Sequence, residues 1–361
     1  MTALDALLRP FALGPLSLPN RVVMAPMTRS RAPGGAPGPD VAAYYARRAA
    51  AGVGLIVTEG TVVERPAASD DPCVPRFWGA EALAGWREVV TAVHGAGGRI
   101  MPQLWHVGAT RGRRSQWASD SAMESPSGLM MAPDQPFGAA MTETDIAETI
   151  AAFARAARAA FDLGFDGVEI HGAHGYLIDQ FLWAATNRRA DTWGGATAAE
   201  IVRAIRREVG PQTPISLRIS QFKQQDYDAR LANGPQELEA LLRPLTDAGV
   251  DLFHCSQRRF WEPAFASSPL NLAGWTRKLS GRPTITVGSV GLSGDFIRAL
   301  SGDIAEPASI EGLLERLAAG EFDLVAIGRA LLADPHWLEK VRAGRLDELE
   351  AFDLSRLNSL H

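Results

Sequence analysis

Two histidines and a tyrosine lie close together in the segment His171-Gly-Ala-His174-Gly-Tyr176. Imidazoles three residues apart can point to one side of a helical turn and donate hydrogen bonds to a single oxygen atom. The phenolic hydroxyl of Tyr176 could supply a proton. The pattern predicts a site that binds a substrate oxygen and transfers a proton.

The same residues allow two other interpretations. The histidines could be packed in the core beside the tyrosine, or they could bind a metal ion with His106, His254 or Glu59 as further ligands. No His-x-His pair follows the first expected strand, and the segment Pro26-Met27-Thr28 offers no good ligand there. This absence counts against a metal site.

Two glycine-rich turns near the C-terminus could bind an anion. Gly288-Ser289 and Gly328-Arg329 place glycines where backbone N–H groups can approach a phosphate, and Arg329 adds a planar cationic fork. Phosphate sites after strands seven and eight recur in α/β barrels. Glycines also make tight turns for structural reasons, but the two turns together favour a phosphorylated ligand.

Arg218 lies near the end of an apolar segment, where a lone buried cation is costly without an anionic partner. That partner is either a ligand or the carboxylate of a structural salt bridge. Trp105, beside Gln103, could pack against a flat ligand or belong to the core.

Short apolar segments alternate with amphipathic segments, which indicates strands followed by helices. Several strands are continuously apolar, as is typical of a parallel sheet covered on both faces. The expected strands are 22–25, 55–58, 99–104, 167–170, 215–219, 252–254, 284–287 and 324–327. Thr142 and Asp145 predict a capping box at the start of one helix. Eight such units predict an α/β protein with a single-domain (β/α)8 TIM barrel, and a doubly wound sheet is the alternative.

The active site of an α/β barrel lies at the C-terminal ends of its strands. Each expected strand ends in or is soon followed by polar residues, which include Thr28, Glu59, Gln103, His171, Arg218, His254, Ser289 and Arg329. We therefore expect the candidate residues to meet at one end of the barrel.

Two connections, 109–141 and 256–269, are unusually long for an α/β unit. Long loops in a compact barrel are often lids or binding loops, and disorder is the alternative for the first. Phe260 and Trp261 in the second loop are candidate substrate contacts, and with the tail 349–361 they could cap the pocket or meet a neighbouring subunit. No linker divides the chain, so one domain is assigned to residues 1–361.

Composition excludes several classes of protein. The 361 residues are 46% hydrophobic with a net charge of −5, which argues against disorder and against binding to nucleic acid or an anionic membrane. Two cysteines cannot form a disulfide framework, a four-cysteine zinc site or an iron–sulfur cluster, and they fit a reducing cytosol. Without a secretory signal or an apolar run of about 18 residues, we expect a cytoplasmic protein.

Several motifs, taken together, resemble the Old Yellow Enzyme family of FMN-dependent ene reductases, also called NADH:flavin oxidoreductases. They occur in family order and include Asn20-Arg-Val-Val-Met-Ala-Pro-Met-Thr-Arg29, Thr58-Glu-Gly-Thr61, Gln103-Leu-Trp-His106, Asp166-Gly-Val-Glu-Ile-His-Gly-Ala-His-Gly-Tyr-Leu-Ile-Asp-Gln-Phe-Leu182 and Asp323-Leu-Val-Ala-Ile-Gly-Arg329. The resemblance implies a (β/α)8 barrel that binds FMN tightly and non-covalently, with NAD(P)H as co-substrate.

The resemblance also implies which residues would bind FMN. Pro26, Met27 and Thr28 would lie along the isoalloxazine ring, and Gly60 and Gln103 would contact its polar edge. Arg218 would sit beside N1 and O2, where negative charge builds on reduction. The phosphate would be held by Gly288, Ser289, Gly328 and Arg329, in agreement with the two glycine-rich turns.

By the same resemblance, His171 and His174 would bind the carbonyl or nitro oxygen of an α,β-unsaturated substrate. NAD(P)H would reduce FMN, flavin N5 would deliver hydride to the β-carbon, and Tyr176 would protonate the α-carbon. A metal-dependent hydrolase that uses His171 and His174 is the alternative function, and a non-catalytic flavin- or phosphate-binding protein is a third.

The chain departs from the family pattern at several places. Position 28 is Thr, where one branch has Cys, and His171/His174 replaces the His/Asn pair of some members. The segment 196–200 is shorter than usual. Residues 109–141 and 221–231 match poorly, so we expect them to set substrate and nicotinamide choice. The natural substrate stays open, and the protein is expected to be a monomer or homodimer.

Overall fold

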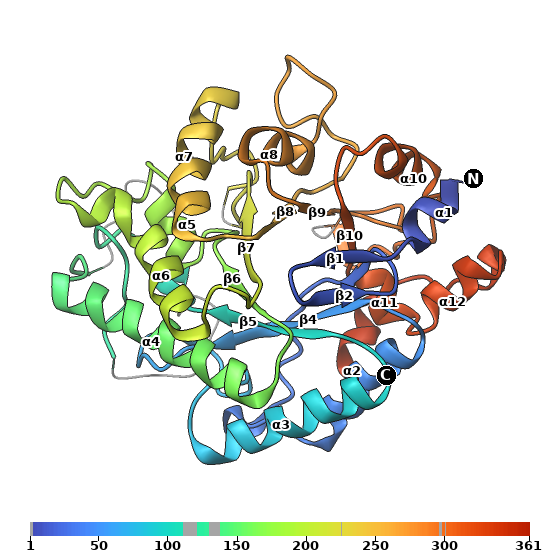
Figure 1. Ribbon diagram of the computed structural model, residues 1–361, viewed down its shortest axis with the longest axis horizontal. Coiled ribbons are helices and arrows are strands. Elements are labelled where there is room, and N and C mark those ends of the chain that lie inside the picture. Colours follow the sequence, from blue (N-terminus) through green and yellow to red (C-terminus); the bar gives the residue numbers. More distant parts are fainter. Residues whose placement is uncertain (1–2, 111–120, 130–137, 225, 296–297, 300) are drawn as a thin grey trace.

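Eight parallel strands close into a barrel in the computed structural model, which describes all residues except 1–2, 111–120, 130–137, 225, 296–297 and 300 (Figure 1). Neighbouring strands follow the order β10-β3-β4-β5-β6-β7-β8-β9 around the barrel. The strands are β3 (Val22–Met24), β4 (Leu55–Val62), β5 (Ile100–Trp105), β6 (Val168–His171), β7 (Ile215–Ser220), β8 (Leu252–Ser256), β9 (Thr284–Val287) and β10 (Leu324–Ile327).

Helices surround the barrel and pack their apolar faces against the strands (Figure 1). The longer helices are α2 (Pro39–Ala50), α3 (Ala80–Gly95), α4 (Glu143–Leu163), α6 (Trp193–Val209), α7 (Pro235–Ala248), α8 (Leu272–Ser280) and α10 (Glu311–Ala318); the shorter ones are α1 (Ala3–Leu8), α5 (Leu177–Leu182), α11 (Arg329–Ala333) and α12 (Trp337–Arg342). The predicted capping box is present at the start of α4, because Thr142 and Asp145 bond to each other's backbone N–H groups.

The predicted (β/α)8 barrel is confirmed. Each of the eight expected strands coincides with a barrel strand, and the differences are confined to the strand ends. β10 pairs with both β3 and β9, so the sheet has no free edge and the doubly wound alternative is wrong.

A short antiparallel hairpin, β1 (Phe11–Leu13) and β2 (Leu16–Leu18), was not expected from the sequence. Leu16 and Leu18 form one apolar cluster with residues of the barrel interior, among them Leu55, Leu252 and Leu324. These three leucines are the first residues of their strands, so the hairpin covers the N-terminal end of the barrel. In Figure 1 the hairpin crosses the barrel in dark blue.

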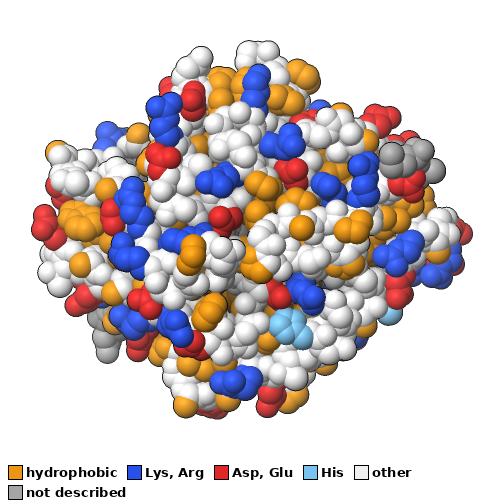
Figure 2. All heavy atoms as spheres, in the orientation of Figure 1, with side chains coloured by type: hydrophobic (Ala, Val, Ile, Leu, Met, Phe, Trp, Pro, Cys, Tyr) orange, Lys and Arg blue, Asp and Glu red, His pale blue; other side chains and the backbone are white. Residues whose placement is uncertain are grey.

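The surface carries charges of both signs. Figure 2 shows Lys and Arg side chains interspersed with Asp and Glu over one face of the molecule. No helix in the described part of the chain combines the length and the apolar character needed to cross a membrane.

Candidate active site

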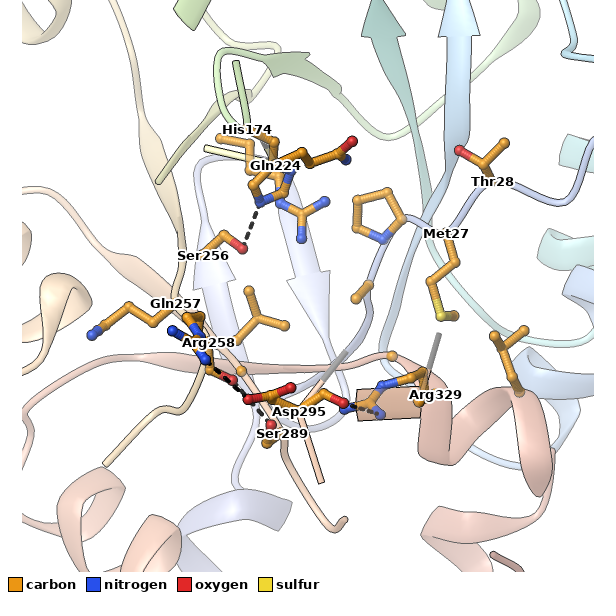
Figure 3. A pocket seen from close by; sticks show the side chains of 18 of the residues that line it. Met27, Thr28, His174, Gln224, Ser256, Gln257, Arg258, Ser289, Asp295 and Arg329 are labelled. Carbon is orange, nitrogen blue, oxygen red and sulfur yellow. Dashed lines mark hydrogen bonds and ion pairs between the residues drawn. The ribbon is translucent and has the colours of Figure 1, made fainter. Parts of the chain in front are cut away.

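A cavity of about 320 Å³ lies at the C-terminal ends of the barrel strands. This volume is within the range of small-molecule sites. Fourteen of the sixteen candidate residues line it: Pro26, Met27, Thr28, Gly60, Gln103, Trp105, His171, His174, Tyr176, Arg218, Gly288, Ser289, Gly328 and Arg329. Figure 3 shows labelled side chains from both ends of the chain meeting there.

The two remaining candidates, Phe260 and Trp261, do not line the cavity. The Phe260 N–H donates to the Gly288 carbonyl (3.1 Å), and the Phe260 side chain is packed in the core. The Trp261 ring is packed edge-to-face on Phe260 and is 42% exposed at the surface. The structure therefore gives no support to the expectation that these aromatics contact substrate.

His171, His174 and Tyr176 form one aromatic cluster with Trp105. The ring centroid of His171 lies 5.3 Å from that of His174 and 4.9 Å from that of Tyr176. Trp105 packs edge-to-face on Tyr176 at 4.9 Å. His174 adopts a left-handed backbone conformation (φ 65°), which is uncommon for a residue with a Cβ. The turn after β6 therefore holds three polar rings at one wall of the cavity.

The two histidines are uncharged at neutral pH. Burial, reinforced by the positive charge of Arg218, places the pKa of both His171 and His174 well below the usual value. The Ser256 hydroxyl lies 2.8 Å from Nε2 of His174 and fixes its ring (Figure 3). Burial raises the pKa of Tyr176 to about 12, so its phenol keeps its proton.

Arg218 is buried at the cavity. Among the described residues, its side chain makes no ion pair, and its Nε has no hydrogen-bond partner. Burial lowers the pKa of Arg218 to about 10, so the guanidinium still carries its charge at neutral pH. The salt-bridge interpretation is therefore not supported, and a bound anion or a polarised ring oxygen would complete the site.

The Glu169 carboxylate positions the side-chain amide of Gln103. Gln103 Nε2 donates to the buried Glu169 carboxylate (2.8 Å), which also accepts from the Ser216 hydroxyl (3.0 Å). His254 Nδ1 lies 2.9 Å from the same carboxylate. This network lies inside the barrel and fixes the orientation of the Gln103 side chain.

The turns after β9 and β10 form a cradle at the other end of the cavity. A Cβ at Gly288 would lie 2.5 Å from the Gln257 carbonyl oxygen, so only glycine fits there. Ser289 is left-handed (φ 50°), and Arg329 donates to the carbonyl of Gly294 (2.6 Å). Asp295 also lies here, ion-paired with Arg258 (3.2 Å; Figure 3).

The sequence reasoning missed several cavity residues. Phe222, Gln224 and Tyr227 line the cavity from the loop after β7, and Gln257 and Arg258 line it from the loop after β8. We expected residues 221–231 to set substrate and nicotinamide choice, but this expectation named no single residue of the loop. Within the long loop 109–141, residues 111–120 and 130–137 lie outside the described part.

The C-terminal tail completes the cavity. Phe352, Leu354 and Leu357 contribute to its wall. The Arg29 guanidinium donates to three tail carbonyls, those of Arg356 (3.2 Å), Leu357 (3.3 Å) and Ser359 (2.7 Å). The expectation that the tail caps the pocket agrees with this arrangement.

The other candidate metal ligands are occupied by structural contacts. His106 Nε2 lies 2.7 Å from Glu124, and Glu59 accepts the backbone N–H groups of Arg29 (2.8 Å) and Ser30 (3.1 Å). Burial raises the pKa of Glu59 to about 7. In the described part of the chain, no three His, Cys, Asp or Glu side chains come together as a metal site.

The sequence matches the NADH:flavin oxidoreductase / NADH oxidase family over residues 6–348. The chain belongs to this family. The resemblance to the Old Yellow Enzyme family is thereby confirmed, and the protein is a flavin oxidoreductase with FMN as cofactor and NAD(P)H as co-substrate.

Individual relatives support the assignment. The chain is 34% identical to 12-oxophytodienoate reductase 7 of Oryza sativa subsp. japonica, over 93% of this chain and 87% of that protein. It is 33% identical to NADH oxidase of Thermoanaerobacter brockii, of which it spans 50% of the length, and 93% of this chain is covered. The structure of morphinone reductase in complex with tetrahydroNAD superposes with a TM-score of 0.78 at 30% identity, covering 97% of this chain and 93% of that one.

The cavity of this flavin oxidoreductase fits FMN. The buried Arg218 guanidinium at one end, whose Nε has no hydrogen-bond partner among the described residues, suits the polar edge of the isoalloxazine ring. The cradle formed by Gly288, Ser289 and Arg329 suits the phosphate. Between these two ends, Pro26, Met27 and Thr28 form one wall. FMN when bound supplies the chemistry of accepting and donating a hydride.

Proposed function

We propose that this flavin oxidoreductase is an ene reductase that acts on α,β-unsaturated carbonyl compounds or nitroalkenes, in the Thr-containing branch of the family with a His/His substrate pair. The observation that carries the proposal is the cluster of His171, His174 and Tyr176 on one cavity wall, with ring centroids about 5 Å apart. The relatives named as 12-oxophytodienoate reductase and morphinone reductase are consistent with such substrates.

Neutral histidines suit the binding of a carbonyl or nitro oxygen. Because the pKa of each imidazole is well below its usual value, each ring keeps a single N–H at neutral pH. Nδ1 of His171 accepts a weak hydrogen bond from the Ala173 N–H (3.4 Å), which leaves Nε2 to carry the proton. Donation to the substrate oxygen would withdraw electrons from the conjugated C=C bond.

Tyr176 is the proposed proton donor. Its phenol is protonated at neutral pH and lies in the same cluster as the two histidines. A substrate whose oxygen is bound by the histidines would present its α-carbon to the phenol while the β-carbon receives hydride. Holding the alkene in this position is mainly an effect of proximity and orientation.

Arg218 is proposed to stabilise the negative charge that develops on the cofactor during reduction. The guanidinium is fixed at the cavity before any ligand binds, so little reorganisation accompanies the reaction. Thr28 and Gln103 are proposed to contact the ring, and Gly288, Ser289, Gly328 and Arg329 to hold the phosphate.

A Tyr176→Phe variant tests the proposal. Purified, FMN-loaded protein should oxidise NAD(P)H under anaerobic conditions and reduce 2-cyclohexenone. In the variant we expect enone reduction to slow by roughly 100-fold or more, since general acid catalysis contributes about 10²–10⁴-fold, with flavin reduction by NAD(P)H largely preserved.

The two outcomes that contradict the proposal are distinct. Failure of the unaltered protein to bind FMN or to oxidise NAD(P)H with an enone would exclude the ene reductase function. Loss of flavin reduction in Tyr176→Phe, with the enone step intact, would exclude only the role of Tyr176. The alternative of a metal-dependent hydrolase has no support from the relatives or from the described side chains.

A further inference from the structure

Gln224, in the loop after β7, contacts the proposed proton donor directly. Its side-chain Nε2 donates a hydrogen bond to the phenolic oxygen of Tyr176 (3.0 Å). Gln224 lines the cavity and is exposed. Its side chain lies beside His174 in Figure 3.

This hydrogen bond has a defined direction, and the direction matters for proton delivery. A phenol has one O–H donor and accepts at its oxygen. Because the Gln224 amide donates to that oxygen, the hydroxyl proton is not used in this contact and stays available to the cavity. A carboxylate at the same place would accept the proton and turn it away from the substrate.

We infer that Gln224 is a positioning residue for the proton of Tyr176, which it directs toward the substrate by donating to the phenolic oxygen. The inference rests on the proposed ene reductase function. It assigns a specific task to a residue of the loop 221–231, which we expected to set substrate and nicotinamide choice.

The segments that carry the donor and the acceptor of this hydrogen bond are both bound by one buried carboxylate, that of Asp179. The residue before Gln224 is Lys223, whose Nζ lies 2.6 Å from the Asp179 carboxylate, and both side chains are 0% exposed. Asp179 also accepts the N–H of Gly175 (2.6 Å), the residue before Tyr176. One buried carboxylate therefore holds the turn that carries Tyr176 and the loop that carries Gln224.

Backbone contacts also join the loop after β7 to the turn that carries Tyr176. The Gln224 N–H donates to the carbonyl of His174 (3.3 Å), and the His174 N–H donates to the Ser220 hydroxyl (2.9 Å). Lys223 and His174 form a parallel β-bridge. An exposed glutamine would ordinarily sample many conformers, but here the backbone at residues 223 and 224 is held in place, which limits the positions that the side chain can reach.

Two substitutions of Gln224 compare the loss of its hydrogen bond to Tyr176 with the reversal of donor and acceptor in that bond. Gln224→Leu removes the donor, and we expect the enone half-reaction to slow about fivefold, the effect of one ordinary hydrogen bond. Gln224→Glu reverses the hydrogen bond, and we expect slowing of roughly 100-fold with an increased solvent deuterium isotope effect. Flavin reduction by NAD(P)H is measured as a separate half-reaction, so that any effect of the loop on nicotinamide binding is not counted in the enone step. Gln236→Glu, an exposed site on α7, makes the same charge change as a matched control.

A double-mutant cycle shows whether Gln224 acts through the phenol. In a Tyr176→Phe background, Gln224→Glu should have no further effect on the enone half-reaction. Equal rates for Gln224→Glu and the unaltered protein, or a full additional loss in the Tyr176→Phe background, would overturn the inference. Failure of the ene reductase proposal is seen separately, as absence of enone-dependent NAD(P)H oxidation by the unaltered protein.

Discussion

A buried arginine without a carboxylate partner is costly to a folded protein that has no ligand. Arg218 is such a residue, since its Nε has no hydrogen-bond partner and Glu169 acts on it only as a nearby charge. Its cost would be offset when the cofactor binds. This side chain is therefore better explained by ligand binding than by the stability of the empty barrel.

Arg218→Met should raise the thermal stability of the flavin-free protein and lower its affinity for FMN. Removal of the unpaired charge should raise the unfolding midpoint of the flavin-free protein, because an apolar side chain of similar length suits the buried site. FMN should bind about 10–100-fold more weakly, since hydrogen bonds to charged groups contribute about 1.5–3 kcal/mol. Thermal unfolding and flavin fluorescence titration measure the two effects. A lower midpoint for the flavin-free variant would show that Arg218 has a structural partner.

Residue type and position after a strand were enough to find several of the polar cavity residues. His171, Arg218 and Arg329 could be predicted because the ends of barrel strands converge whatever the loops do. Phe260 was expected near the substrate but is packed in the core, because the direction of a loop side chain depends on tertiary contacts that the sequence does not show. Gln224 was missed for the same reason: the sequence does not show the buried Lys223 that fixes its backbone.

Helix α5 and the loop after β7 are joined by the buried ion pair between Asp179 and Lys223. The strength of such a pair is seen when one partner is removed, because an uncompensated charge then stays in the interior. The pair therefore makes the two elements behave as one unit, and this unit carries most of the proposed proton-transfer machinery.

Lys223→Met should destabilise the protein by about 3–5 kcal/mol, measured by chemical denaturation. The double variant Lys223→Met/Asp179→Asn should recover most of this loss, because an amide oxygen can still accept the Gly175 N–H. Arg243→Met, in an exposed pair with Glu239, serves as the control and should cost less than about 1 kcal/mol. If the double variant is no more stable than Lys223→Met, the loss comes from packing and not from the unpaired charge.

At the scale of the whole molecule, the barrel has a packed apolar cluster at one end and the candidate active site at the other. The hairpin β1–β2 covers the N-terminal end, and the cavity lies at the opposite end. The barrel could be predicted from eight apolar strands, but the hairpin could not. Its strands have three residues each, too few for an alternating pattern to stand out, and their burial depends on the barrel beneath them.

A Leu18→Ala variant tests whether packing at the N-terminal end of the barrel affects the site at the other end. Loss of a fully buried leucine from the cluster under the hairpin should cost about 2–5 kcal/mol of unfolding free energy. FMN affinity and the rate of enone reduction below the unfolding transition should stay unchanged. Ser17→Ala, on the exposed side of the same strand, is the matched control. A parallel loss of FMN affinity would mean that the two ends of the barrel are coupled.

The cavity wall runs from Ala25 in the loop after the first barrel strand to Leu357 in the tail, and the tail is held by Arg29 near the start. During synthesis on the ribosome, the early residues of the wall emerge long before the late ones. The cofactor pocket therefore cannot close until the residues up to about 357 have been released. Capture of flavin is expected to follow the formation of the barrel.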